Sequence, residues 1–353
     1  MKTAEFRSVC YVILATIFIL SSGTGVSAAD KVYKWKMATS WPTGLPIYKE
    51  MAKAFANNVK ELTDGRLVIQ VLPGGTVTSA LETTNAVQKG IVQMAHTWPG
   101  YDMGIDRTTA VLGGWAGGMD ATGTFHWLYF GGGHELWQEF RMEKFGVVSF
   151  ALGILPPEVF AHSHKPIKTL DDFKGFKIRT AGAWADILPK LGAAPITLPS
   201  AEVFQALERK VIDATEVSTP GQNLPLGYHE ITKYIMFPGA HQPSATFELN
   251  INKKAWDSLP KDIQAVIRVA AQNTTFTSWI TIGGLDIKAV KAFKENGNEI
   301  IYLDADVQKQ IKALGKDWAN ELSKENAWAK KVIESMTAFE KEWSTVENIR
   351  KFY

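Results

Sequence analysis

The chain of 353 residues is long enough for two folded domains, because a single hydrophobic core rarely grows beyond about 250–300 residues. Its 46% hydrophobic and 21% charged residues are typical of a globular protein and exclude a disordered chain or one that crosses a membrane many times. The 38 basic and 36 acidic residues give a net charge of +2, so the chain lacks the basic excess of nucleic-acid-binding proteins.

Residues 1–28 have the pattern of a cleaved secretory signal peptide. Lys2 and Arg7 precede an apolar segment over residues 9–20, and small residues follow it. This segment is shorter than the roughly 20 residues that cross a bilayer as a helix. The single cysteine, Cys10, lies within it, so the mature chain contains neither a disulfide nor a thiol nucleophile. We therefore expect an exported, periplasmic protein rather than one held by an uncleaved anchor.

Strand and helix patterns alternate along the first part of the mature chain. The expected strands are 33–39, 67–72, 91–96 and 145–152, and the expected helices are 47–62 and 79–89. Strands that alternate with helices usually pair in parallel. We therefore predict a first α/β domain over residues 29–152.

A similar pattern restarts after the prolines at 156 and 157. The expected strands are 176–179, 195–198 and 211–216, and the expected helices are 184–191 and 200–210. Thr169 and Asp172 have the spacing of a capping box at a helix start. We predict a second α/β domain over residues 153–243.

The C-terminal third is expected to be mostly helical. Residues 246–252 predict a late strand, so that 244–290 return to the first domain while 291–320 complete the second. All 15 prolines precede residue 261, which favours long helices beyond it, and 321–353 form a helical extension. The predicted fold class is α/β, with two domains and long helices in the C-terminal third.

Common enzyme signatures are missing from the sequence. It contains neither a Walker-type Gly-Lys-Ser/Thr loop nor a Gly-x-Ser-x-Gly nucleophile elbow, and the segment His134-Glu135 lacks the second histidine of a zinc protease helix. His162 and His164 lie two residues apart in a strand-like segment and would share one face. Because no third ligand is nearby, we interpret them as surface histidines. These features favour a protein without catalytic activity.

Arg179 stands at the end of a predicted strand, where ligands bind in α/β sheets. Its guanidinium matches a carboxylate with two parallel hydrogen bonds, although an ion pair with a neighbouring acid explains the residue equally well. Glu216 takes the equivalent position on a later strand. A carboxylate there would repel an anionic ligand unless it paired with Arg179 or held a cation.

Three segments of the second domain resemble the solute-binding proteins of tripartite ATP-independent periplasmic (TRAP) transporters. They are TLDDFKGFKIR over residues 169–179, LPSAEVFQAL over 198–207 and IDATE over 212–216. The resemblance covers essentially the whole mature chain. WKMATSWP over 35–42 and YFGGG over 129–133 resemble in particular the branch that binds 2-oxo acids, often labelled mannitol/chloroaromatic transport proteins.

The resemblance implies two α/β domains joined by crossing strands and a long helix, which close over a ligand as a hinged clamp. It places the family's carboxylate-binding arginine on Arg179. In the oxo-acid branch a glutamine and a Glu-Trp pair help to hold a cation that bridges to the substrate. Here the glutamate falls on Glu216, but Val217 follows it in place of tryptophan, and the glutamine position falls on Glu158.

These departures carry expectations of their own. A second carboxylate favours Ca²⁺ over Na⁺, or the metal is absent, and no cofactor is required. The loss of the tryptophan leaves room for a substrate larger than pyruvate. Trp41, Trp98 and Tyr101 follow strands of the first domain, so we expect an aromatic or extended monocarboxylate, with packing in the core or at the rim as the alternative role of these rings.

The leading interpretation is a binding protein that captures a small 2-oxo or 2-hydroxy monocarboxylate and delivers it to a TRAP membrane permease. The alternatives are a dicarboxylate or sugar acid as the ligand, or an exported hydrolase or lyase with a site built from Glu158, Glu216 and His241. The long C-terminal helices, by the same resemblance, imply a homodimer formed by helix exchange.

Overall fold

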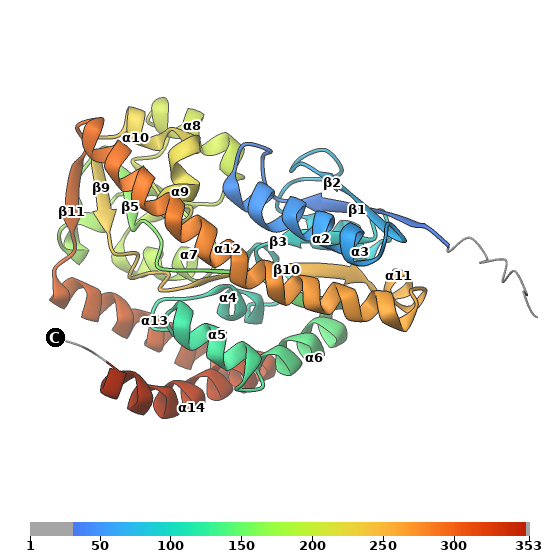
Figure 1. Ribbon diagram of the computed structural model, residues 1–353. Helices are drawn as coiled ribbons and strands as arrows, with labels where there is room; N and C mark the ends of the chain where they lie inside the picture. The colour runs from blue at the N-terminus through green and yellow to red at the C-terminus, as the bar shows by residue number, and fades with distance from the viewer. Residues whose placement is uncertain (1–30, 351–353) are drawn as a thin grey trace, which may run out of the picture.

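The computed structural model describes residues 31–350, so the predicted signal peptide over 1–28 lies outside the described residues. The described chain forms two β-sheets with helices packed around each, and the long helix α12 (Lys261–Glu295) runs along both (Figure 1). None of the helices in this part of the chain is both long and apolar enough to span a membrane. The predicted two-part α/β fold is confirmed.

The first sheet has the strand order β2-β1-β3-β10-β4. Its strands are β1 (Tyr33–Thr39), β2 (Leu67–Leu72), β3 (Met94–Thr97), β4 (Val147–Leu155) and β10 (Ala245–Asn252). The strand β1 pairs in parallel with β2 and β3, as the alternation of strands and helices predicts. The strand β10 pairs antiparallel with β3 and β4, so the late strand is inserted inside this sheet.

The second sheet has the strand order β11-β9-β5-β8-β6-β7. Its strands are β5 (Ala161–Ser163), β6 (Lys177–Arg179), β7 (Ala194–Ile196), β8 (Ala214–Thr215), β9 (Tyr234–Phe237) and β11 (Glu299–Tyr302). Three chain segments connect the sheets: from β4 to β5, from β9 to β10, and from β10 through α12 to β11. The expected domain limits remain a prediction.

Short helices fill the connections. Those around the first sheet are η1 (Ile47–Lys53), α2 (Ala54–Leu62), α3 (Thr83–Gln88), η2 (Pro99–Asp102), α4 (Thr108–Gly113), α5 (Ala121–Tyr129), α6 (Gly133–Phe145) and α11 (Lys253–Asp257). Those around the second are η3 (Leu170–Phe173), α7 (Ala183–Ile187), η4 (Leu188–Leu191), α8 (Ser200–Glu208), α9 (Pro220–Asn223), η5 (Leu224–Leu226) and α10 (Tyr228–Ile231). Thr169 and Asp172 form the expected capping box, at the start of η3.

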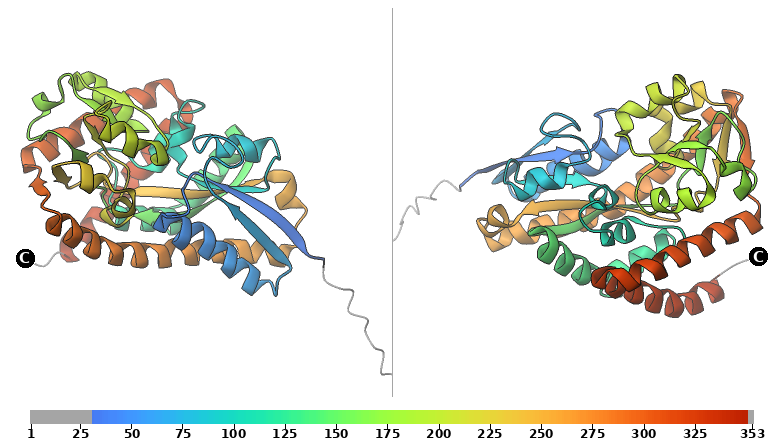
Figure 2. Two further views of the ribbon diagram at one scale, coloured as in Figure 1. Left: turned by 90° about the horizontal axis from the view of Figure 1, so that it is seen from above. Right: turned by 180° about the vertical axis from the view of Figure 1, so that it is seen from behind.

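The C-terminal third contains the predicted long helices. After α12 come α13 (Ala305–Glu325) and α14 (Ala327–Arg350), which lie together along one side of the molecule (Figure 2). The helix α14 is anchored to the first part of the chain, because the Trp127 Nε1 donates to Ser335 Oγ at 3.1 Å and the Trp328 Nε1 donates to Glu143 Oε1 at 2.9 Å.

A cluster of buried charges joins α6, η2 and β10. Arg141 donates from Nη1 to Asp102 Oδ2 at 2.8 Å and from Nε to Glu248 Oε2 at 3.0 Å, and Nη2 bonds Glu248 Oε1. Trp137 Nε1 and Ser149 Oγ also donate to Glu248 Oε2, each at 3.2 Å. The guanidinium and both carboxylates are therefore paired without help from solvent, as buried charges require.

Candidate functional site

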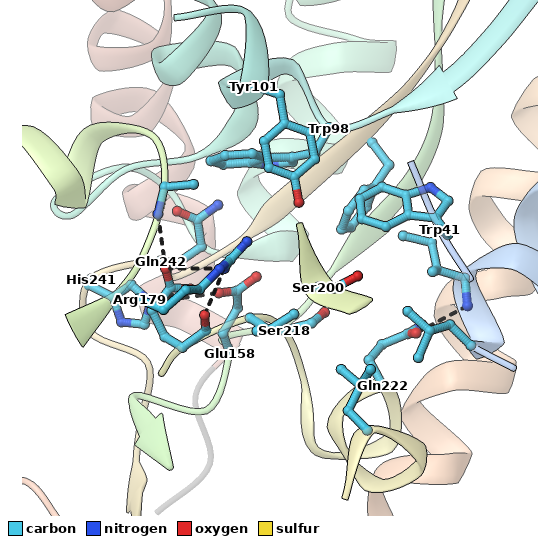
Figure 3. A pocket seen from close by; sticks show the side chains of 17 residues that line it. Trp41, Trp98, Tyr101, Glu158, Arg179, Ser200, Ser218, Gln222, His241 and Gln242 are labelled. Atoms are coloured by element: carbon cyan, nitrogen blue, oxygen red, sulfur yellow. Dashed lines mark hydrogen bonds and ion pairs between the residues drawn. The ribbon is translucent and has the colours of Figure 1, made fainter. Parts of the chain in front are cut away.

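A pocket lies between the two sheets, and both contribute to its wall (Figure 3). It contains all seven residues that the sequence singled out for ligand binding: Trp41, Trp98, Tyr101, Glu158, Arg179, Glu216 and Val217. The three aromatic residues follow strands of the first sheet. In the second sheet, Arg179 is the last residue of β6 and Glu216 comes directly after β8. Glu158 lies in the segment that connects the sheets. Residues far apart in the sequence therefore meet at the carboxyl ends of strands, where α/β proteins bind ligands.

The Arg179 guanidinium is buried and held in one orientation. Its Nε and Nη2 donate to the Leu198 carbonyl at 3.0 and 2.8 Å, and its Nη1 donates to the Glu216 carbonyl at 2.9 Å. These bonds use three of the five N–H groups of a guanidinium, so one N–H on each Nη lies outside them. The Tyr101 hydroxyl interacts with this group from the first sheet (Figure 3). Backbone carbonyls thus orient Arg179 while its charge is only partly balanced.

Glu158, Glu216 and His241 form a buried cluster next to Arg179. The His241 Nε2 lies 3.6 Å from Glu158 Oε2 and 3.5 Å from Glu216 Oε2, and the Arg179 Nη1 lies 3.9 Å from Glu216 Oε1. These are the three residues that the hydrolase or lyase alternative required, so the structure brings that set together as well.

The electrostatics of this cluster follow from burial and proximity. Burial lowers the pKa of His241, but the two carboxylates beside it outweigh this effect and raise the pKa to about 9. Burial and the neighbouring Glu216 raise the pKa of Glu158 despite the opposing effect of His241. Burial also acts to raise the pKa of Glu216, but His241 and Arg179 together bring it below its usual value. Glu216 is therefore the carboxylate that stays ionised most readily.

The same cluster has the donor set of a cation site. One ligand atom from each of Glu158, Glu216 and His241 lies within 4.8 Å of the others. Both ring nitrogens of His241 are buried and have no hydrogen-bond partner among residues 31–350. Two carboxylates supply the hard oxygen ligands that Na⁺ and Ca²⁺ prefer, and they would offset the charge of such an ion. The two carboxylates therefore fit a bound cation, and His241, which is protonated near neutral pH because its pKa is raised to about 9, can join them as a ligand once it has lost its proton.

Aromatic rings form the wall of the pocket on the side of the first sheet. Trp98 and Tyr101 pack edge to face with centroids 5.4 Å apart, and Trp41 packs against Tyr101 at 6.1 Å and Phe247 at 5.6 Å. A Cβ added at Gly182 would lie 2.4 Å from Trp98 Cη2, so this glycine lets the second sheet approach the ring closely. The rings therefore serve in packing and line the pocket at once.

Sequence reasoning missed several polar residues of the pocket, namely Ser200, Ser218, Gln222 and Gln242. Ser200 begins α8, where a serine is expected for helix capping alone. Gln222 lies in α9, whose four residues are too few for a periodic pattern. Gln242 lies in the irregular segment between β9 and β10. At these positions the sequence pattern does not distinguish a residue that contacts a ligand from one that forms a turn or caps a helix.

The interpretation of His162 as a surface histidine is wrong. Its side chain is 0% exposed and packs edge to face with Tyr228 and Phe293. Burial lowers its pKa to about 3, so the ring is neutral. His164 is half-buried, and its Nε2 contacts the Leu207 carbonyl at 2.8 Å. The strand β5 is covered on the face of His162 because helices pack on this sheet, which alternation alone does not reveal.

Comparison with known proteins identifies the family. The model of the bacterial extracellular solute-binding protein family 7 (DctP) matches residues 37–326, most of the chain. The chain belongs to this family. The monocarboxylate 2-oxoacid-binding periplasmic protein of Nostoc sp. (strain PCC 7120) is 28% identical over 356 aligned positions, covering 99% of this chain and 97% of that protein.

Two solved structures of TRAP solute-binding proteins align over nearly the whole described chain. One, from Pseudoalteromonas atlantica with bound sodium and pyruvate, has a TM-score of 0.86 at 30% identity and covers 91% of this chain and 97% of its own. The other, from Bordetella bronchiseptica, has a TM-score of 0.87 at 26% identity and covers 91% of this chain and 95% of its own. It is a mixed-occupancy dimer with copurified calcium and picolinate in one active site.

Proposed function

We propose that this chain is the solute-binding protein of a TRAP transporter and that it captures a small 2-oxo or 2-hydroxy monocarboxylate. The observation that carries the proposal is Arg179: a buried, oriented guanidinium in a pocket between two sheets. A buried carboxylate needs a charge partner and several hydrogen bonds to offset its desolvation. The two N–H groups of Arg179 outside its backbone bonds supply such a fork. The Nostoc relative and the pyruvate-bound structure support the same ligand class.

The capture mechanism follows from the position of the pocket between two sheets. Trp41, Trp98 and Tyr101 approach the ligand from the first sheet, and Arg179 approaches it from the second. Ligand between them joins the two walls and favours the closed arrangement, because it gains contacts with both only when they meet. Water is then excluded, which strengthens the contact between the carboxylate and Arg179.

We propose that a cation, Na⁺ or Ca²⁺, binds at Glu158, Glu216 and His241 and completes the site. Such an ion would supply a positive charge to which the carboxylate and the 2-oxo or 2-hydroxy oxygen of the ligand are attracted. Support comes from the donor set of this chain and from relatives with sodium and pyruvate or calcium and picolinate. The second carboxylate, Glu158, favours Ca²⁺ because it adds a negative charge and a hard oxygen ligand.

The aromatic wall and Val217 set the size of the ligand in this proposal. A valine at position 217 occupies less of the pocket than a tryptophan would, which leaves room for a chain longer than that of pyruvate. Trp98 and Trp41 line the same pocket and pack against Tyr101. We infer that the ligand is an extended or aromatic acid rather than pyruvate itself.

Delivery to a TRAP membrane permease in the periplasm is the proposed role of the captured acid. It rests on membership of a solute-binding family and on the signal-like residues 1–28. A binding protein performs no chemical step, so we also propose that the chain is not an enzyme. Incubation of the purified protein with a bound acid, followed by NMR of the recovered acid, tests this directly. A converted product would support the hydrolase or lyase alternative.

We further propose that two chains associate by exchange of the C-terminal helix α14. Within one chain this helix packs on α4, α5, α6 and α13, and it starts just after Asn326, where α13 ends. A second copy offers the same surface, so exchange would preserve contacts such as that of Trp127 with Ser335. Light scattering at micromolar concentration should give the mass of a dimer. A monomer mass would contradict the exchange.

A thermal-shift screen tests the ligand class. The purified protein is heated with 2-oxo monocarboxylates, dicarboxylates and sugar acids, each with and without EDTA. Because a ligand that binds the native state raises the melting temperature, 2-oxo monocarboxylates should stabilise the protein most. Arg179→Ala should lose the effect, and Arg209→Ala, which removes an exposed arginine of the same sheet region, should keep it.

The remaining arms of this screen separate the parts of the proposal. Loss of stabilisation in EDTA places a divalent ion in the site, whereas an effect that needs only sodium salts indicates Na⁺. Stabilisation by dicarboxylates or sugar acids alone would overturn the monocarboxylate assignment. Stabilisation that survives Arg179→Ala would overturn the role of the arginine.

A further inference from the structure

The pocket has a second polar end, away from the charged cluster. Figure 3 shows Arg179 and His241 at one end of the pocket and Gln222 at the other, on the side of Trp41. Ser218 lies between them. Gln222 and Ser218 both line the pocket and both are almost completely buried, with 2% and 6% of their surface exposed.

One contact fixes the orientation of the Gln222 side chain. The Ile47 backbone N–H, at the start of η1, donates to Gln222 Oε1 at 3.1 Å. A backbone N–H can only donate, so the atom that faces it must be the amide oxygen, and the NH₂ group must point the other way. That Nε2 is buried and has no hydrogen-bond partner among residues 31–350. The two N–H donors of Gln222 Nε2 are therefore unpaired and can donate to an acceptor.

Ser218 is in a similar situation. Its backbone carbonyl accepts from the Val159 N–H and from Asn223 Nδ2, each at 3.0 Å, which fixes the chain at this residue. Its hydroxyl Oγ is buried and has no partner within the described chain. A buried polar group without a partner is costly, and nearly all such groups in native proteins are paired. Two of them facing one pocket indicate a bound molecule.

We propose that Gln222 and Ser218 form a second subsite, which binds a neutral oxygen acceptor on the tail of the ligand. The inference rests on the proposed function and narrows its substrate class. The ligand is a monocarboxylate whose carboxylate end meets Arg179 and whose chain carries an ether, hydroxyl or carbonyl oxygen that meets Gln222. Pyruvate, whose chain ends in a methyl group, would leave both donors unpaired.

The charges of the pocket exclude a second carboxylate at this end. Arg179 is the one arginine or lysine among the described residues that line the pocket, and it belongs to the opposite end. Around Gln222 the wall is apolar, with Leu45, Ile47 and Leu226. A carboxylate there would be a buried charge without a counter-charge. Its desolvation free energy is far larger than the stabilisation that hydrogen bonds from two neutral donors provide.

Pairs of acids that differ in one atom test the subsite. In 3-methoxy-2-oxopropanoate, 4-methoxy-2-oxobutanoate and 5-methoxy-2-oxopentanoate an ether oxygen replaces a CH₂ of 2-oxopentanoate, 2-oxohexanoate and 2-oxoheptanoate. Each pair has the same length, and the series moves the oxygen along the chain. Isothermal titration should show one ether acid that binds about tenfold more tightly than its alkyl partner, the change expected for one well-made hydrogen bond.

Variants show which residues produce the preference. Gln222→Met removes the amide and Ser218→Ala removes the hydroxyl, and each should reduce the ether-to-alkyl affinity ratio towards one. Gln272→Met, at an exposed position of α12, should leave the ratio unchanged. The ratio is the readout because a loss of folding or of closure would weaken both members of a pair equally.

Three results would overturn the inference. In the first, no ether acid binds more tightly than its alkyl partner at any length, while both still depend on Arg179; the proposed function then stands without the subsite. In the second, the preference survives in both Gln222→Met and Ser218→Ala. In the third, no 2-oxo acid of either series binds, and the proposed function fails together with the subsite.

Discussion

Two buried charge clusters in this protein each combine one arginine with two carboxylates, and the pocket cluster adds His241. They differ in how completely the chain itself pairs these groups. In the core cluster, Arg141 bonds Asp102 and Glu248 directly. In the pocket cluster, Arg179 donates to backbone carbonyls and lies 3.9 Å from the nearest carboxylate oxygen, that of Glu216. Burial of charge is therefore not what distinguishes a binding site from a structural network.

The difference lies in the partners that each cluster leaves open. Trp137, Ser149 and Asn250 supply further hydrogen bonds to Glu248, so each charged group of the core cluster is paired within the chain. In the pocket cluster, His241 keeps both ring nitrogens without a hydrogen-bond partner among the described residues. A closed network stabilises one structure, whereas an incomplete one binds whatever completes it. Variants of each cluster alone can test this difference.

The largest expected effect is on stability and concerns the core cluster. Arg141→Met leaves Asp102 and Glu248 as buried carboxylates without a counter-charge and should lower the free energy of unfolding by roughly 3–5 kcal/mol. Urea unfolding followed by circular dichroism measures this loss. A variant as stable as the parent would show that the core cluster is not a structural network.

The pocket cluster should respond in affinity rather than in stability. Arg179→Met removes the carboxylate partner and should weaken binding of the best 2-oxo acid about 100-fold, the cost of breaking a charge-assisted bidentate contact. Its unfolding free energy without ligand should fall less than that of Arg141→Met, because Glu216 keeps His241 at 3.5 Å. Titration calorimetry and urea unfolding of both variants give the comparison. Equal losses of stability would contradict it.

The buried histidines provide a contrast in pH dependence. Burial lowers the folded-state pKa of His162 to about 3, below its unfolded value, so between these values the unfolded chain binds a proton that the folded chain does not. Stability is therefore lost as pH falls below about 6.5. From pH 6.5 to 5.5 this residue should contribute a loss of about 1 kcal/mol. Urea unfolding at several pH values measures this: between pH 6.5 and 5.5 the unfolding free energy of His162→Gln should fall by about 1 kcal/mol less than that of the parent protein. An equal fall in both proteins would show that the ring is not held neutral.

The size of the pocket should affect ligand selectivity rather than stability. Val217→Trp adds a large ring to the wall and should weaken binding of 2-oxohexanoate about tenfold while affinity for pyruvate changes little. Val211→Trp, at an exposed position nearby in sequence, is the matched control. Calorimetry with both acids measures the difference. Equal weakening for pyruvate and 2-oxohexanoate would contradict the role of Val217 in setting ligand length.

The sequence predicts the fold well where its patterns are long. Alternation of apolar and polar residues predicted β1, β2 and β10, and the absence of proline after residue 260 predicted long helices. The structure confirms both. Strands of two or three residues, such as β6 and β8, are set by pairing with neighbours, so their limits do not follow from local periodicity. The burial of His162 depends on helices packed over β5, which no short segment of sequence encodes.

The candidate site was predictable only in part. Arg179 and Glu216 stand at strand ends, where the architecture itself indicates ligand contact. Gln222 and Ser218 lie in a short helix and the turn before it, and their significance appears only when the fold leaves their polar atoms buried without partners. Polar satisfaction is a property of the whole structure rather than of a motif.

The most direct test of the account is a crystal structure of the protein grown with Ca²⁺ and 2-oxobutanoate. We expect the acid in the pocket between the sheets, with its carboxylate on the two Nη atoms of Arg179 and the ion against Glu158 and Glu216. A structure with the acid elsewhere, or with its carboxylate turned away from Arg179, would contradict the central claim that the incomplete cluster is the binding site.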